Sequence, residues 1–295
     1  MVVQQAIAAN VCHPQDNEPA SRLIELPVIP DSLRQPEVRA EYLIVHFWDN
    51  ADFNAISLPV LEQSLVDFLS VLPHSSSDER KKEGFSRMLD KSAANPDIYS
   101  RLTAMTDDYL NSGESPVRND SDYIIFLNAL NERTGTNEIQ RARIADRLEM
   151  LNKNRRGSMA TDFDFVSGNG QSMSLYGFLA ENQCKTLLIF FDPECEACEE
   201  TMAEVLKIET FKENGGSDEL QVIAIYPGEN REAWIRRAET LPSRWTIGIN
   251  PGEIEDKELY YLPEMPTAYL IDTDKRVADR AWGLQSILEM INFAL

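Results

Sequence analysis

Apolar residues in the first half of the chain recur at the spacing of helices. Between residues 57 and 72 they follow the i, i+3, i+7 pattern of a helix with one buried face. Polar residues, glycines and prolines interrupt the pattern at intervals. It predicts six helices, over residues 39–48, 57–72, 76–93, 96–112, 120–133 and 137–151. Ile44 and Val45 favour a strand as the alternative for the first of them.

No segment of residues 37–152 needs to be a strand. We therefore expect an all-helical domain over residues 37–155, ending in a basic polar linker near residues 153–158. The prolines and the weak periodicity of residues 1–36 predict an extended or mobile lead-in.

In the second half, short apolar runs alternate with amphipathic stretches. This alternation predicts an α/β domain over residues 156–295. We expect strands at 162–166, 172–175, 186–191, 220–226, 245–249, 269–271 and 277–282, and helices at 175–181, 199–210 (ended by Asn214, Gly215 and Gly216), 230–238, 255–262 and 286–295.

The richest chemistry lies where the apolar strand 186–191 turns into the helix that follows it. Cys195 and Cys198 occupy this junction in a C-x-x-C arrangement. Unpaired N–H groups and a partial positive charge at a helix start favour a thiolate there. The pattern therefore predicts an exposed nucleophile at Cys195 and a resolving thiol at Cys198.

Two other interpretations of the cysteine pair are weaker. A zinc site needs four ligands, whereas Cys12 and Cys184 are single and distant and all three histidines lie far upstream. A purely structural disulfide has no need of a helix start at its sulfur. His46, among apolar and aromatic neighbours, is interpreted as a core or boundary residue, and Cys184 as a half-buried spectator thiol.

A second motif lies about seventy residues further on. Pro266 precedes the strand at 269–271, in the sequence Pro-Thr-Ala-Tyr-Leu-Ile-Asp. Together, the Phe-Phe-x-x-x-Cys-x-x-Cys segment and this motif resemble the thioredoxin-like family. The likeness is greatest to its periplasmic branch related to cytochrome c maturation reductases. It covers nearly all of the second half, and it implies a cis peptide bond before Pro266 that faces the cysteines.

The resemblance also implies a function and the residues that carry it. It implies dithiol–disulfide exchange with protein substrates, without a cofactor, supplied with electrons by an upstream thiol reductant in the periplasm or cell envelope. The catalytic residues would be Cys195, Cys198, Pro266 and Glu200, and the substrate-binding residues would be Met265, Thr267, Glu194, Glu196 and Ala197.

The first half has a resemblance of its own. The segment Arg39 to Leu43, with Phe47, Trp48 and Asp49, resembles the helical region of unknown function that precedes thioredoxin-like domains in Bacteroidetes proteins. We find no constellation for chemistry in this half.

The sequence departs from the family pattern around the thiols. Ile189 stands where minimal thioredoxins carry a buried carboxylate, and Thr201 stands where the cytochrome c maturation branch carries a glutamate. Glu200 is therefore our choice of proton acceptor for Cys198. The carboxylates of Glu194, Glu196, Glu199 and Glu200 disfavour a thiolate and oppose the helix start. We expect a reductant or moderate exchanger rather than a strong oxidant.

Composition narrows the class further. The chain has 295 residues with 28 basic and 49 acidic side chains, a net charge of −21, which argues against binding nucleic acid. No stretch is long enough to span a membrane. Residues 6–8 (Ala-Ile-Ala) resemble the end of a signal-peptidase site, although a disordered N-terminus fits equally well. Lipidation of Cys12 fits its surroundings poorly.

Two rival functions remain open. A thioredoxin-like domain reduced to a binding or adaptor module would fit the carboxylate replaced by Ile189, but the intact cysteine pair opposes it. A thiol peroxidase would use one activated cysteine rather than a C-x-x-C pair.

Overall fold

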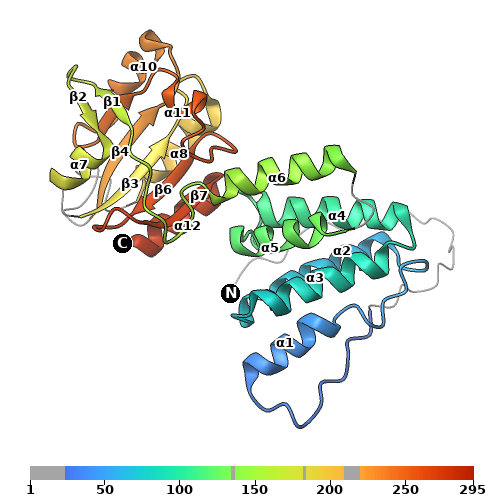
Figure 1. Ribbon diagram of the computed structural model, residues 1–295. Coiled ribbons are helices and arrows are strands. Elements are labelled where there is room, and N and C mark those ends of the chain that lie inside the picture. The colour runs from blue at the N-terminus through green and yellow to red at the C-terminus, as the bar shows by residue number, and fades with distance from the viewer. Residues whose placement is uncertain (1–23, 134–136, 182–183, 209–219) are drawn as a thin grey trace, which may run out of the picture.

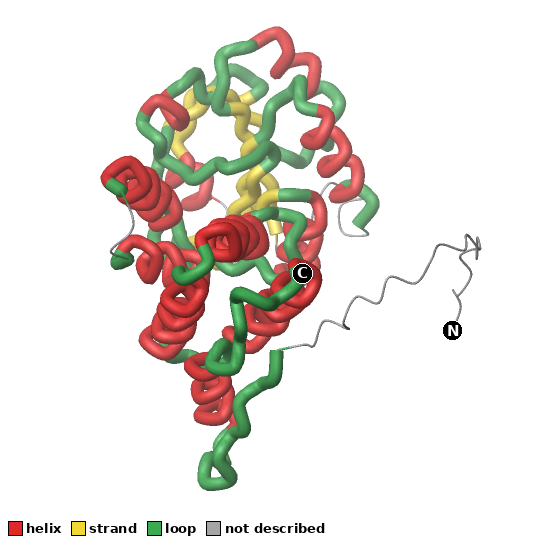
Figure 2. The backbone as a smooth tube through the Cα atoms, turned by 90° about the vertical axis from the view of Figure 1, so that its right-hand side faces the viewer, coloured by secondary structure: helices red, strands yellow, loops and turns green. Residues whose placement is uncertain are grey.

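The computed structural model describes residues 24–133, 137–181, 184–208 and 220–295, which form two lobes (Figure 1). Helices build one lobe, and a sheet flanked by helices builds the other. In the view turned by 90°, the strands gather at one end of the molecule (Figure 2). The expected lead-in falls partly outside the described residues, as do the end of the helix predicted at 199–210 and its stop at 214–216.

The helical lobe confirms the all-helical prediction for the first half. The strand alternative for residues 39–48 is wrong, since these residues lie mostly in the first helix. Polar caps set several boundaries: Ser77 accepts a hydrogen bond from the Arg80 N–H, and Asn137 forms a reciprocal capping box with Gln140. The helices are α1 (Pro36–His46), α2 (Leu58–Val71), α3 (Asp78–Ser92), α4 (Pro96–Asn111), α5 (Asp120–Asn131) and α6 (Glu138–Asn152), with a 3₁₀ turn at Leu72–His74.

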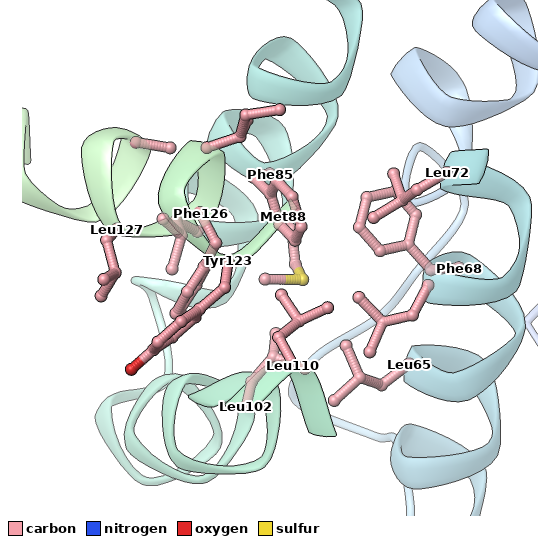
Figure 3. Close-up of a cluster of buried hydrophobic side chains, with 14 of the residues drawn as sticks. Leu65, Phe68, Leu72, Phe85, Met88, Leu102, Leu110, Tyr123, Phe126 and Leu127 are labelled. Atoms are coloured by element: carbon pink, nitrogen blue, oxygen red, sulfur yellow. The ribbon is translucent and has the colours of Figure 1, made fainter. Parts of the chain in front are cut away.

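Aromatic and aliphatic side chains from α2, α3, α4 and α5 fill the core of this lobe (Figure 3). Phe85 packs edge-on against Phe68 of α2, with ring centroids 5.4 Å apart, and contacts Phe126 of α5 at the same distance. Such contacts add to the free energy gained by burying the rings. His46 lies at the edge of the lobe, where its Nδ1 is 2.7 Å from an Asp49 carboxylate oxygen.

The second lobe confirms the predicted α/β fold. Its strands are β1 (Asp164–Ser167), β2 (Ser172–Ser174), β3 (Lys185–Phe190), β4 (Leu220–Tyr226), β5 (Thr246–Ile249), β6 (Thr267–Ile271) and β7 (Val277–Trp282), and its helices are α7 (Leu175–Glu181), α8 (Glu196–Val205), α10 (Arg231–Ala238), α11 (Glu253–Asp256) and α12 (Leu284–Ala294). The described strands form one sheet in the order β2-β1-β5-β4-β3-β6-β7.

Strand β3 lies within the sheet, parallel to β4 and antiparallel to β6. Its side chains alternate between two apolar layers, as expected for a strand buried on both faces. Leu187 and Ile189 pack with α8, α10 and α12, whereas Leu188 and Phe190 pack with α7 and α11. The carboxyl end of β3 leads directly to the cysteine pair.

The structure corrects two predicted helix boundaries. Helix α8 begins at Glu196 rather than at residue 199, so it starts directly after Cys195. The helix predicted at 255–262 is instead the single turn α11, which Glu258 follows with a left-handed φ of 47°. Tyr260 then packs into the core of the α/β lobe, and Tyr261 packs into the core of the helical lobe. Consecutive side chains point in opposite directions in an extended chain, whereas in a helix with one buried face they do not.

The two lobes share a buried interface. Tyr261 and Trp282 of the α/β lobe belong to the core of the helical lobe, and their rings meet edge-on at 5.5 Å. The Trp282 indole N–H donates to the Asn111 carbonyl at 3.0 Å, and the Arg118 guanidinium lies 4.3 Å from the centroid of its ring. A Cβ at Gly113 would overlap the Trp282 carbonyl, so only glycine permits this close approach.

Arg280 of β7 fixes the interface electrostatically. Its side chain is 2% exposed, and its Nε lies 2.5 Å from a carboxylate oxygen of Asp120 on α5. Its two terminal nitrogens donate to the carbonyls of Leu151 and Lys153, at 2.8 and 2.9 Å. The guanidinium thus meets an opposite charge and two carbonyl dipoles, which compensate for its burial.

The predicted linker is part of this interface. The Gly157 N–H donates to the Val277 carbonyl at 2.7 Å, and the Val277 N–H donates to the Ser158 carbonyl at 2.9 Å. Asn154 is 4% exposed, and its side-chain amide donates to the Leu259 carbonyl at 2.7 Å. Residues 153–158 therefore pack against the α/β lobe and are not a free linker between the lobes.

Candidate active site at the start of helix α8

Cys195 is the N-cap residue of α8. Its backbone is extended, with φ −86° and ψ 120°, and its Sγ accepts a hydrogen bond from the Cys198 N–H at 3.3 Å. A sulfur in this position lies at the positive end of the helix dipole. Cys195 is partly exposed, and both cysteines are free thiols in this structure. A partner sulfur can therefore reach Cys195.

Cys198 lies one turn further along and is only 1% exposed. Burial raises the pKa of its thiol well above the ordinary value, because a thiolate loses its hydration there. The backbone of Asp192 donates a hydrogen bond that acts in the opposite direction, and the neighbouring Cys195 thiol adds to the increase. Cys198 is thus a buried thiol that is neutral at ordinary pH.

The Met265–Pro266 peptide bond is cis, the isomer that the sequence predicts. Antiparallel pairing of Phe190 with Thr267 brings the ends of β3 and β6 together, so the two motifs meet in space. The Cys195 Sγ lies 3.5 Å from the Met265 carbonyl oxygen. Pro266 is buried, and Met265 is half-buried beside the thiol.

The predicted substrate-contact residues divide into two groups. Glu194, Glu196 and Ala197 are exposed at the start of α8, and Met265 is half-buried beside Cys195. Thr267 is fully buried, and its hydroxyl donates to the Glu264 carbonyl at 2.5 Å. Its side chain is therefore covered in this structure, and a substrate contact by Thr267 stays a prediction.

Local partners hold two of the four acidic residues near the thiols. A Glu194 carboxylate oxygen accepts a hydrogen bond at 3.1 Å from Asn230, the N-cap residue of α10. A Glu199 carboxylate oxygen lies 3.1 Å from Arg237 near the end of the same helix. The charge of Glu199 is therefore partly neutralised, and both contacts connect α10 to the residues around the thiols.

Asp192 is a residue that the sequence analysis missed. Its carboxylate accepts the Glu194 N–H at 2.8 Å, and its backbone carbonyl accepts the Cys195 N–H at 3.2 Å. Its charge also raises the pKa of two buried groups, the Cys198 thiol and the Tyr226 hydroxyl, although burial is the larger cause for both.

Glu200, which the sequence analysis chose as the proton acceptor for Cys198, does not face that thiol. It is exposed two residues after Cys198 on α8, and side chains two apart on a helix do not face each other. Side-chain direction on α8 therefore does not bring Glu200 toward Cys198, whereas the charge of Asp192 acts on the pKa of the Cys198 thiol. No local spacing rule distinguishes Asp192, because its approach to Cys198 depends on how the chain turns after β3.

Among the cysteines that the structure describes, Cys184 lies outside this site. Cys184 lies half-buried just before β3, and Cys12 is outside the described residues. Over the described ranges, no group of three or more His, Cys, Asp or Glu side chains has an arrangement that could hold a metal ion. In the same part of the chain, no helix is both long enough and apolar enough to cross a membrane.

Comparisons with known proteins found a family model and solved structures that resemble this chain. A family described as a domain of unknown function (DUF5106) matches residues 4–154. The crystal structure of a thioredoxin-like protein from Bacteroides caccae is 32% identical, with a TM-score of 0.76, and the match covers 92% of this chain and 99% of that one. Comparison with proteins of curated function gave no match.

Two other solved structures resemble about half of the chain. The thioredoxin domain of a thiol-disulfide oxidoreductase from Bacteroides vulgatus is 19% identical, with a TM-score of 0.39, and the match covers 48% of this chain and 98% of that domain. A thiol-disulfide oxidoreductase from Bacteroides fragilis is 18% identical, with a TM-score of 0.39, and the match covers 47% of this chain and all of that one (100%).

The fold and the paired cysteines at the start of α8 define a thioredoxin-like protein. The chain belongs to the thioredoxin-like proteins, and its N-terminal half carries a DUF5106 domain.

Proposed function

We propose that this protein is a thiol-disulfide oxidoreductase that exchanges disulfides with protein substrates. The observation that carries the proposal is the arrangement of the two cysteines. Cys195 is partly exposed at the helix start, Cys198 is buried, and the Cys198 N–H donates to the Cys195 Sγ at 3.3 Å. This division of exposure suits a nucleophile and a resolving thiol.

In the reducing direction, the Cys195 thiolate attacks one sulfur of a substrate disulfide. A bond forms between Cys195 and that sulfur, and the other substrate sulfur leaves as a thiolate that takes up a proton. Cys198 then loses its proton and attacks the Cys195 sulfur, which releases the second substrate thiol. Two electrons pass to the substrate, and the protein is left with a Cys195–Cys198 disulfide. An upstream thiol reductant restores the dithiol.

Substrate docking would use the surface around Cys195. The half-buried Met265 and the exposed Glu194, Glu196 and Ala197 border the thiol, while Pro266 shapes the groove beneath them. An extended segment of the partner would lie along this edge, near the end of β6. We place the reaction in the periplasm or cell envelope, as the resemblance to the exported branch implies.

A redox titration tests the proposal. In dithiothreitol or glutathione buffers, we expect Cys195 and Cys198 to titrate as one reversible two-electron pair, with a midpoint between about −180 and −300 mV. Alkylation followed by mass spectrometry measures the dithiol fraction. A pair that fails to titrate reversibly would contradict the proposal and favour an adaptor role.

The Asp192→Asn variant is expected to resolve mixed disulfides about 100-fold more slowly, because it removes the base that takes the Cys198 proton. Asparagine keeps the oxygen that accepts the Glu194 N–H, so the turn should persist. The lifetime of a mixed disulfide between Cys195 and a thiol peptide measures the effect.

The direction of the change is informative. If Asp192 acted only through its charge, removing it would lower the pKa of Cys198 and speed the resolution step. Glu200→Gln is the matched control and should leave the lifetime unchanged. Slower resolution in Glu200→Gln alone would restore the assignment made from the sequence.

A further inference from the structure

A groove in the helical lobe has no role in the proposed thiol chemistry. Helix α5 packs against both α4 and α6, and the space above it forms a cavity of about 980 Å³. One face of α4 lines the groove from Pro96 to Asp107, which is about 16 Å along the helix axis. The volume lies within the range of small-molecule sites.

Part of the lining is apolar. Phe126 and Leu130 of α5 and Ile144 of α6 form the apolar part. Of the α4 side chains that line the groove, Thr103 and Ala104 at the middle of the helix are small, whereas Tyr99 is large, so the groove is left open on that side only at the middle of α4. Its shape suits a narrow, elongated apolar group.

The acidic side chains of the groove already have partners. Asp90 forms an ion pair with Arg133, and Asp107 accepts a hydrogen bond from the Tyr123 hydroxyl. Glu132 lies 2.6 Å from Lys82, which points to it from α3. These carboxylates are therefore poorly placed to attract a cationic ligand.

The basic side chains are only partly used. Arg143 of α6 is exposed and has neither a hydrogen bond nor an ion pair with any residue that the structure describes. The Arg133 Nε is buried and, within the same residues, lacks a hydrogen-bond partner. A buried donor without an acceptor costs free energy, which an incoming anion would recover. Both arginines line the same cavity.

We propose that this groove binds a linear amphipathic carboxylate. The carboxylate group bonds to Arg143 and to the Arg133 Nε, and the alkyl chain lies along α4 over Phe126 and Ile144. The inference concerns the DUF5106 domain alone and does not depend on the thiol chemistry. It assigns this domain a small-molecule site that is separate from Cys195.

The test uses the full chain and octanoate as the probe, followed by amide chemical shifts in ¹⁵N-labelled protein. We expect saturable shifts along α4 and α6. Arg143→Gln should weaken octanoate binding about 10-fold or more, the loss expected for one charge-assisted hydrogen bond. Binding of 1-octanol, which has the same chain without the charge, should be weaker and unaffected by this variant.

Two further variants control the experiment. Arg141→Gln removes an exposed arginine two residues away on α6, one that does not line the groove, and should leave binding unchanged. Ala104→Phe fills the groove from an exposed position, so the fold should persist while binding is lost. Absence of saturable shifts, equal losses in the two arginine variants, or unchanged binding in Ala104→Phe would each overturn the proposal.

Discussion

Replacing Cys195 by serine is expected to abolish disulfide exchange, whereas replacing Cys198 should trap the substrate on Cys195. Without Cys195 no accessible sulfur remains at the start of α8, and Cys198 is only 1% exposed. Burial also raises the pKa of the Cys198 thiol, so few thiolates form there at neutral pH. The remaining thiol in Cys195→Ser should therefore be alkylated slowly.

Cys198→Ser leaves the nucleophile but removes the group that releases the substrate. A mixed disulfide should accumulate and survive until an external thiol is added. Non-reducing electrophoresis and mass spectrometry of the complex detect it. Cys184→Ser is the matched control, since Cys184 precedes β3 whereas Cys195 follows the other end of that strand, and it should keep full exchange activity. Exchange that persists in Cys195→Ser would contradict the assigned nucleophile.

The second large effect is expected at the interface between the lobes. Arg280→Met should lower the free energy of unfolding by about 3 kcal/mol, because it removes the donor to one Asp120 carboxylate oxygen and to the carbonyls of Leu151 and Lys153. Arg118 still pairs with the other Asp120 oxygen at 3.1 Å. Methionine retains much of the side-chain volume, so the loss reports on charge and hydrogen bonding rather than on a cavity. Urea unfolding followed by tryptophan fluorescence measures the change.

Arg276→Met provides the comparison. Arg276 lies just before β7, is exposed, and donates to the Gly157 carbonyl at 2.8 Å. Its replacement should change the free energy of unfolding by no more than about 0.5–1 kcal/mol. Asp120→Asn completes a double-mutant cycle with Arg280→Met that isolates the energy of the pair. If Arg280→Met and Arg276→Met lowered the free energy of unfolding equally, the buried Arg280–Asp120 pair would contribute no more to stability than an exposed hydrogen bond.

Local pattern explains why most of the fold could be predicted. Helix spacing and caps such as Ser77 and Asn137 are short-range signals, and the continuous apolar run of β3 identifies a strand buried on both faces. The two motifs at Cys195 and Pro266 are weak signals alone, and they could be paired because together, in this order, they resemble the thioredoxin-like family. Prediction failed at residues 255–262, where a helical composition yields to packing of two adjacent tyrosines into different cores.

Long-range partners explain what the sequence could not provide. Arg280 and Asp120 are 160 positions apart, and an arginine in a strand of mixed polarity resembles an ordinary surface residue. Asp192 and Glu200 are both carboxylates within a few positions of Cys198, and sequence distance alone favoured Glu200. Only the path of the chain between β3 and α8 distinguishes them.

The packing of Tyr261 and Trp282 also bears on how such a protein can evolve. Both residues belong to the α/β half of the sequence, yet they fill the core of the helical half. A recombination event at residue 155 would separate Trp282 from the Asn111 carbonyl and from the Arg118 side chain that covers its ring. A new partner domain would need to supply matching groups at the same positions. The two halves are therefore expected to be inherited as a pair, and viable chimeras should carry the loop at 111–120 together with β7.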